Sequence, residues 1–208
     1  MTDGWIWPTV ALLGVWHGIN PAMGWLFAVA SGMQERSGAA VWRSLVPLAA
    51  GHALAVAGAV LAAALVGAVL PVRAVQWLVA GSLVGMGIYR LVRARHPRFG
   101  SMQMGSVELA TWSLLMATAH GAGLMVVPLV LRESATVVPV SHHLAAVAPG
   151  PAVAMILVHT GSYLLVTAAV AAVVYSWLGL RQLRTLWVNL DLVWGVVLVL
   201  TGVATAWV

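Results

Sequence analysis

Six apolar runs, each about as long as a bilayer is thick, constrain this chain more than any other feature of its sequence. They lie at about residues 5–33, 45–70, 74–92, 110–131, 152–180 and 186–208. A helix rises about 1.5 Å per residue, so roughly 20 apolar residues cross a hydrocarbon layer of about 30 Å. Only 7% of the 208 residues are charged, against roughly a quarter in a soluble domain. We therefore predict an all-α integral membrane protein with six transmembrane helices.

The absence of cysteine limits the kinds of chemistry that this chain can perform. The chain has no cysteine, which excludes disulfides, thiolate metal sites and thiol redox reactions. Its net charge of +5 comes from ten arginines against five acidic residues. Because these charges are sparse and lie mostly between the apolar runs, we interpret them as topology signals and expect no nucleic-acid partner.

The arginines predict how the chain is oriented in the membrane. Eight of the ten fall in the first, third and fifth connections: Arg36, Arg43, Arg90, Arg93, Arg95, Arg98, Arg181 and Arg184. The second and fourth connections hold only Arg73 and Arg132. By the positive-inside rule the odd connections are cytoplasmic, so we expect both termini outside. The expected location is a bacterial-type inner (plasma) membrane.

The rare polar residues of the first three spans recur in the last three. "LLGVWHGINPAMG" resembles "LLMATAHGAGLMVVP", which pairs His17 with His120, and the second spans pair His52 with His159. We therefore divide the chain into two three-helix repeats, residues 1–99 and 100–208. Because three crossings reverse the direction of the second copy, the repeats are predicted to be inverted, as in many transporters.

Two further patterns predict local geometry. Pro21, preceded by Asn20, is expected to break the first helix, with Pro128 as its weaker counterpart. The spacings Gly14 to Gly18 and Gly81 to Gly85 predict close helix contacts.

The histidines are predicted to lie inside the membrane at two depths. At about 1.5 Å per residue, His17 and His120 lie roughly 18 and 15 Å from the starts of their helices, near the middle of the layer. His52 and His159 are expected to be shallower, about 10 Å in, the first from the cytoplasmic face and the second from the outer face. Ionisable groups within a bilayer are costly and usually act on ions, protons or ligands. The four histidines therefore predict a polar path through the protein.

Four imidazoles from four helices are predicted to bind a transition-metal ion such as Ni²⁺, Co²⁺, Cu²⁺ or Zn²⁺. Asn20, Asp191, Met23 and Met125 are candidates to complete the site or relay the ion. The alternative is that each histidine bonds a carbonyl or hydroxyl group on a neighbouring helix and only holds the bundle together.

Two three-helix copies with a His/Pro-bearing first span and a "GH"-type second span resemble the LysE-like transporter superfamily. Within it the nickel/cobalt exporter, sulfite-exporter and CcdA-like branches are the most similar. This resemblance implies a small six-helix carrier that moves an ion through the repeat interface. "HGINPAMG" differs from the His-x4-Asp-His pattern of the nickel branch, and the CcdA-type cysteine pair is absent.

The preferred interpretation is a transporter or exporter of a small ion, most of all a divalent transition-metal cation, in preference to an enzyme. A small anion bound by protonated histidines is a variant of it. The alternatives are a membrane haem or redox protein with histidine axial ligands, a membrane metalloenzyme with Asp191 as base, and a structural subunit. The expected partners are the lipid bilayer and the ion, and the sequence leaves a homo-oligomer open.

Overall fold

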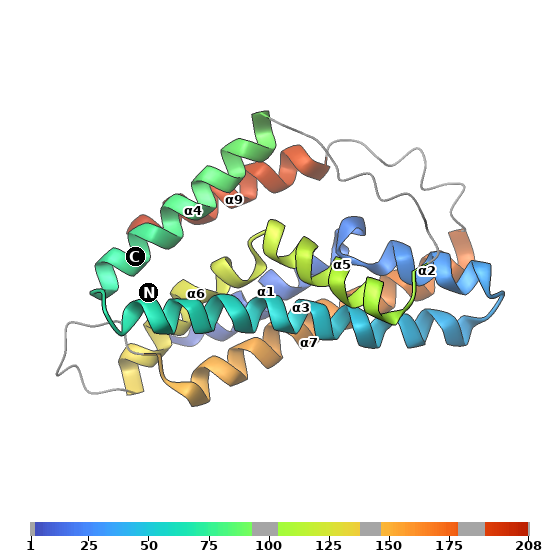
Figure 1. Ribbon diagram of the computed structural model, residues 1–208, viewed down its shortest axis with the longest axis horizontal. Helices are drawn as coiled ribbons and strands as arrows, with labels where there is room; N and C mark the ends of the chain where they lie inside the picture. Colours follow the sequence, from blue (N-terminus) through green and yellow to red (C-terminus); the bar gives the residue numbers. More distant parts are fainter. Residues whose placement is uncertain (1–2, 93–103, 138–146, 179–189, 208) are drawn as a thin grey trace.

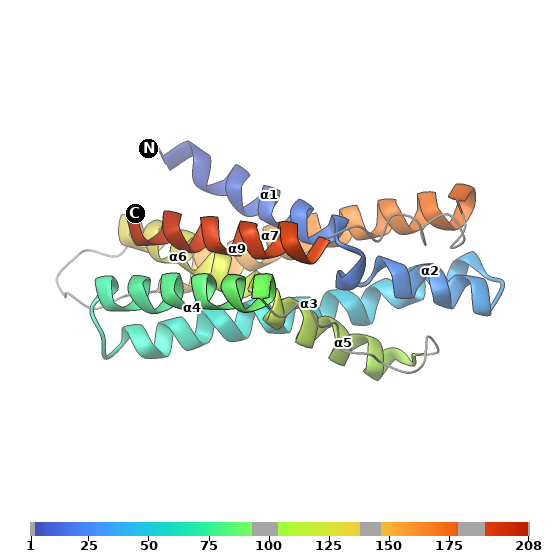
Figure 2. The ribbon, with the colours of Figure 1, turned by 90° about the horizontal axis from the view of Figure 1, so that it is seen from above.

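The computed structural model describes residues 3–92, 104–137, 147–178 and 190–207, and within these ranges the regular structure is helical (Figure 1). The helices form an elongated bundle, and both termini lie at the same end of it in two perpendicular views (Figure 2). The prediction of an all-α protein is confirmed for these residues.

Three of the helices are long and apolar enough to cross a bilayer: α3 (Gly38–Gly67), α4 (Val72–Val92) and α7 (Pro149–Val173), which a π-helical turn (Val174–Leu178) prolongs. A fourth span results if α5 (Ser106–Ala119) and α6 (Ala122–Val137), which are bent by 62°, count as one. The remaining helices are shorter: α1 (Ile6–Ile19), which follows a 3-10 turn (Asp3–Trp5), α2 (Trp25–Gln34) and α9 (Leu190–Trp207). The described residues thus hold three to four candidate membrane spans.

The first predicted span is broken where the sequence indicates. Helix α1 ends at Ile19, a 3-10 turn covers Pro21–Met23, and α2 starts at Trp25. Proline has no N–H to continue the ladder, and the Asn20 side chain accepts the Ala22 N–H, which caps the turn. The predicted break at Asn20 and Pro21 is confirmed.

The second break lies elsewhere than predicted. Helix α5 ends at Ala119, His120 caps it, and Gly121 adopts a positive φ of 72° before α6 begins. Glycine tolerates this left-handed conformation because it has no Cβ. Pro128 lies inside α6. The expectation that Pro128 is the counterpart of Pro21 is therefore wrong, and Gly121 makes the turn.

Glycines let neighbouring helices approach closely. A methyl group at Gly18 of α1 would lie 2.6 Å from the Tyr163 carbonyl oxygen of α7, and one at Gly14 would overlap the His159 carbonyl oxygen. Gly87 of α4 meets the Gly195 backbone of α9 in the same way. Nothing lies within 4 Å of such a group at Gly81 or Gly85. The close contact predicted for Gly14 and Gly18 is confirmed, and that for Gly81 and Gly85 is wrong.

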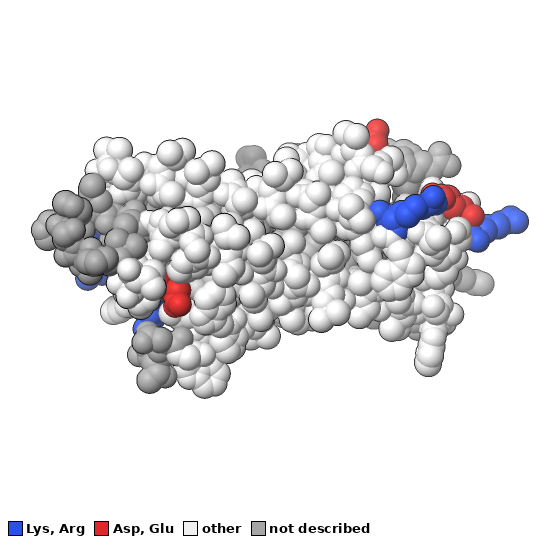
Figure 3. Space-filling model, turned by 90° about the horizontal axis from the view of Figure 1, so that it is seen from below, with Lys and Arg blue, Asp and Glu red and all other residues white. Residues whose placement is uncertain are grey.

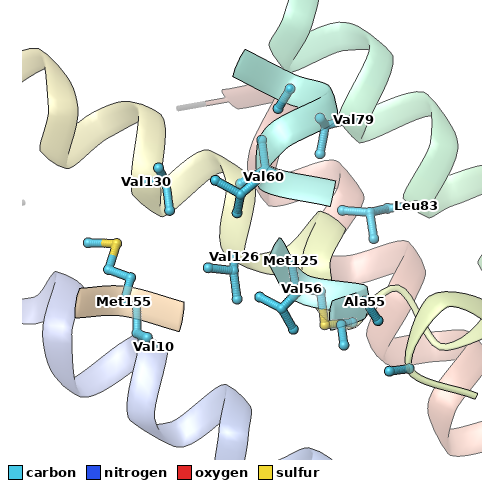
Figure 4. Packing of buried hydrophobic residues seen from close by; sticks show 14 of the residues in the cluster. Val10, Ala55, Val56, Val60, Val79, Leu83, Met125, Val126, Val130 and Met155 are labelled. Atoms are coloured by element: carbon cyan, nitrogen blue, oxygen red, sulfur yellow. The ribbon is translucent and has the colours of Figure 1, made fainter. Parts of the chain in front are cut away.

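The main apolar core contains buried residues from α1, α9 and each of the helices α3 to α7, five of which Figure 4 labels. Fully buried side chains from each of these five meet in it: Val10 of α1, Val56 of α3, Leu83 of α4, Val126 of α6 and Met155 of α7 (Figure 4).

The outer surface is also apolar. Helix α3, for example, exposes Leu54, Leu61 and Leu65. On the face shown in Figure 3, the charged side chains of the residues that the structure describes lie only toward its two ends. An apolar exterior between charged ends is what a bilayer solvates, so the fold is that of a membrane-embedded protein.

Candidate functional site: a buried histidine cluster

Three of the four predicted histidines come together in the interior. The imidazole ring centroids of His17 and His52 are 5.7 Å apart, those of His17 and His159 5.1 Å, and those of His52 and His159 5.3 Å. The rings come from α1, α3 and α7, and all three residues have 0% exposure. We call these three residues the histidine cluster.

The cluster lies at one depth, whereas the sequence predicted two. His52 is 14 residues into α3 because this helix already begins at Gly38, so it lies about 21 Å from the start of the helix. His159 is 10 residues into α7, which begins at Pro149, or about 15 Å in. Because the three rings adjoin one another, the expectation that His52 and His159 lie at a different depth from His17 is wrong.

Backbone hydrogen bonds fix the tautomer of two cluster rings. Nδ1 of His17 lies 2.7 Å from the carbonyl oxygen of Leu13, and Nδ1 of His159 lies 3.3 Å from that of Val10. A carbonyl oxygen can only accept, so each Nδ1 carries the hydrogen and donates it. The Nε2 atom of each neutral ring then presents a lone pair.

The remaining ring nitrogens of the cluster have no partner within the described part of the protein. Nε2 of His17, Nε2 of His159 and both ring nitrogens of His52 are buried without a hydrogen bond. Leaving a buried polar group unsatisfied costs about 1–3 kcal/mol, and most such groups in native proteins are paired. Four such atoms on three adjoining rings point to a ligand that they share.

His120 reaches the cluster through an aromatic residue. The Trp194 ring centroid lies 4.9 Å from that of His17 and 5.1 Å from that of His120. Trp194 also donates its Nε1–H to the His120 carbonyl oxygen at 3.1 Å. Nδ1 of His120 donates to the Met116 carbonyl oxygen at 2.8 Å, which repeats the pattern of His17. The structure thus places Trp194 against both His17 and His120.

Both helix breaks have their free carbonyl groups capped by side chains of other elements. Around the first break, Trp25 donates to the Ile19 oxygen at 2.9 Å, Trp112 to the Ala22 oxygen at 3.0 Å and Tyr163 to the Met23 oxygen at 2.7 Å. At the second, Arg90 donates to the Ala119 oxygen at 3.0 Å. Non-helical backbone is tolerated at membrane depth only when its polar groups are satisfied in this way.

Sequence reasoning missed Tyr163, Trp112 and Trp194. Tyr163 stacks on His52 with ring centroids 3.9 Å apart, and it is fully buried. For Tyr163 and Trp194 the available signal was position, because both lie within the predicted spans and not at their ends, where an aromatic belt belongs. Trp112 lies near the start of the predicted span 110–131 and gave no such signal. Buried Tyr and Trp need an acceptor for their O–H or N–H, which the broken helices supply.

The four residues predicted to complete the metal site or relay the ion lie in different parts of the structure. Asn20 caps the turn after α1, and its side chain is nearly buried. The side chains of Met23 and Met125 belong to the apolar core. The backbone of Asp191 lies in the first turn of α9, and its side chain is outside the described residues.

The arrangement of the rings is not yet a coordination shell. Among the described residues no group of three or more His, Cys, Asp or Glu side chains is disposed to hold a metal ion. The rings of His52 and His159 are nearly parallel, with an interplanar angle of 17°, whereas His17 meets them edge-on. Convergence of the lone pairs on one point therefore requires a ring to turn.

Comparisons of the chain with models of known protein families, with curated proteins and with solved structures found no match. The likeness to LysE-like transporters stays a prediction. The function therefore has to be inferred from the histidine cluster and the helix breaks that surround it.

Proposed function

We propose that this protein is a small membrane transporter or exporter that carries a divalent transition-metal cation through the histidine cluster. One observation carries the proposal: Nδ1–H donation to backbone carbonyls leaves the Nε2 lone pairs of His17 and His159 buried, adjacent and unpaired. Metal-ligating histidines nearly always donate their other ring N–H in this way, which fixes ring orientation and raises basicity. Ni²⁺, Co²⁺, Cu²⁺ and Zn²⁺ all accept imidazole nitrogen.

The architecture we propose around this site has six spans in two inverted three-helix repeats. In it, α1 with α2 and α5 with α6 are broken first spans, α3 and α7 are second spans, and α4 and α9 are third spans. The pairing supports a two-fold relation: α1 packs on α7, α5 packs on α3, and α4 packs on α9. Both first spans break next to a histidine whose Nδ1–H donates to the carbonyl group four residues earlier.

Binding of a metal ion by all three histidines requires the His52 ring to turn, and this rotation costs little free energy in its surroundings. Neither ring nitrogen of His52 has a hydrogen bond, so rotation breaks none. Rotation loses the stacking on Tyr163, which is worth about 0.5–1.5 kcal/mol for an aromatic pair. Coordination by three nitrogens then offsets this cost. A site that closes on the ion and reopens suits a carrier, because transport needs release as well as binding.

The cluster geometry favours a small cation over the other ligands considered. The three rings contact one another directly, so a haem group would have to separate α3 from α7. The unpaired Nε2 atoms of neutral His17 and His159 accept and do not donate, which suits a cation and not an anion. A purely structural role would leave four buried nitrogens unsatisfied.

The proposal is tested by metal binding and flux. Protein purified without chelators is titrated calorimetrically with Ni²⁺, Co²⁺, Cu²⁺ and Zn²⁺, and uptake of the same ions into proteoliposomes is followed with an internal dye. We expect His17→Ala combined with His159→Ala to weaken binding by more than about 100-fold, because even outer-shell changes cost about 10–100-fold.

A matched control replaces His142 and His143, which lie outside the described residues, and should leave binding unchanged. If no ion binds, or if the cluster variant binds like the control, the proposal fails. A visible haem spectrum of the purified protein would favour the redox alternative instead.

A further inference from the structure

A second group of buried polar side chains adjoins the histidine cluster. His159, Tyr163 and Thr167 follow one another at intervals of four residues, so they share one face of α7, and all three have 0% exposure. This face leads from the cluster toward the end of the bundle opposite the termini (Figure 1). The hydroxyl groups of Thr167 and of Ser113, which is fully buried in α5, both adjoin the Tyr163 hydroxyl group. We call Ser113, Tyr163 and Thr167 the hydroxyl cluster.

Two of these hydroxyl groups direct their hydrogen atoms to backbone oxygens. Tyr163 donates to the Met23 carbonyl oxygen at 2.7 Å, and Ser113 donates to the Leu48 carbonyl oxygen at 2.7 Å. A carbonyl oxygen can only accept, so the hydrogen of each hydroxyl group lies on the carbonyl side. Oη of Tyr163 and Oγ of Ser113 therefore keep lone pairs for a further partner.

The third hydroxyl group, that of Thr167, has no hydrogen bond within the described residues although it is fully buried. A helical threonine often avoids this by donating to the carbonyl group four residues earlier. Four threonines elsewhere in this structure do so: Thr9, Thr118, Thr201 and Thr205. Thr167 thus leaves an unsatisfied oxygen next to two oxygens that have free lone pairs, which indicates a ligand that all three share.

The chemistry of this group of atoms matches a small monovalent cation. The three hydroxyl oxygens and the second lone pairs of the Met23 and Leu48 carbonyl oxygens offer more acceptors than the two hydrogens of a water molecule can satisfy. All these oxygens are uncharged, whereas Ca²⁺ sites gain their affinity from carboxylates. Met23 also ends the turn at the break of the first span, and unwound carbonyl groups coordinate Na⁺ in membrane carriers.

We propose that the hydroxyl cluster, together with the Met23 and Leu48 carbonyl oxygens, binds a Na⁺ ion. The bound ion would satisfy the Thr167 oxygen and stabilise the break of the first span against α3, α5 and α7. Na⁺ is preferred to the larger K⁺ because the three hydroxyl groups adjoin one another in a closely packed interior. The site uses none of the histidine nitrogens, so its occupancy does not depend on whether the histidine cluster binds a metal.

The test measures thermal unfolding of the full-length protein in detergent micelles by tryptophan fluorescence. The protein is treated with EDTA, so that no transition metal contributes, and NaCl is compared with KCl and choline chloride at equal ionic strength. A ligand that binds only the folded state stabilises it, so Na⁺ should raise the unfolding temperature by at least about 3 °C over both other salts. Equal unfolding temperatures in the three salts would assign the site to a water molecule and overturn the proposal.

Substitutions locate the effect in the hydroxyl cluster. Thr167→Val removes the unpaired hydroxyl group and should abolish the Na⁺ effect without lowering the unfolding temperature in choline chloride. Ser113→Ala removes a second ligand and should also abolish the effect. The matched control is Thr205→Val, because the buried Thr205 hydroxyl group donates to the Thr201 carbonyl oxygen within its own helix, and this variant should keep the full effect. A Na⁺ effect that persists in Thr167→Val would overturn the proposal.

A further variant and a direct measurement separate this site from the histidine cluster. His17→Ala combined with His159→Ala should keep the Na⁺ effect, and its loss there would place the ion at the histidines instead and overturn the proposal. Radioactive Na⁺ should bind the EDTA-treated protein saturably and be displaced by unlabelled Na⁺ but not by the same concentration of K⁺. Equal displacement by both ions would contradict a site built for Na⁺.

Discussion

Replacing Gly14 with alanine tests whether the close approach of α1 and α7 builds the histidine cluster. The added methyl group would overlap the His159 carbonyl oxygen and lie 2.9 Å from Cβ of Ser162. Carbon atoms in contact are ordinarily about 3.5–4.0 Å apart, so the two helices must separate by up to about 1 Å. Overpacking of this kind costs about 1–3 kcal/mol. The helix propensity gained from Gly to Ala offsets at most about 1 kcal/mol of it.

The matched control is Gly81→Ala in α4, where no atom lies within 4 Å of the new methyl group. The same chemical change should there leave stability unchanged or raise it by up to about 1 kcal/mol. Unfolding in mixed micelles, followed by tryptophan fluorescence, gives both free energies. Gly14→Ala should also weaken metal binding, because it moves His17 away from His159. Equal effects at Gly14 and Gly81 would refute the packing argument.

Three further predictions follow from single contacts. Tyr163→Phe keeps the stacking on His52 but leaves the buried Met23 carbonyl oxygen without its donor, which should cost about 1 kcal/mol of unfolding free energy in the same micelle assay. A loss as large as that of Tyr163→Ala would contradict this. Trp194→Phe keeps the aromatic contact with His17 but removes the donor to the His120 carbonyl oxygen, so transport should fall while metal affinity stays within about twofold. An unchanged ion flux would count against a role in transport for the helix break at His120 and Gly121. Glu35→Gln should change the free energy of unfolding by less than about 1 kcal/mol, because the ion pair of Glu35 with Arg43 is exposed. A larger loss in the micelle assay would contradict the exposure of this pair.

The first helix break was predictable because its cause is local. Proline lacks a backbone donor wherever it stands, and Asn20 is a good capping residue, so both signals are visible in the sequence. The break at His120 and Gly121 was not, because glycine adopts a positive φ only where the surroundings require it. Pro128, the more conspicuous signal, is accommodated inside α6.

The histidine pattern singled out residues that lie close together in the structure, but it did not predict how their side chains meet. The repeat singled out His17, His52 and His159, and the structure brings them together. The position of His52 along its helix was misjudged because α3 begins before its apolar run and includes Arg43. The broken helices are capped by residues far away in the sequence, as Tyr163 caps Met23. Hydrophobic periodicity is a local pattern and does not predict such contacts.

The most direct test of the central claim is X-ray absorption spectroscopy of the protein loaded with one equivalent of Ni²⁺ or Zn²⁺. We predict a first shell with three imidazole nitrogens, at about 2.0–2.1 Å for Zn²⁺. The variant with His17→Ala and His159→Ala should lose this shell. A shell of oxygen ligands alone, or the same nitrogen shell in that variant, would contradict a metal site at the histidine cluster.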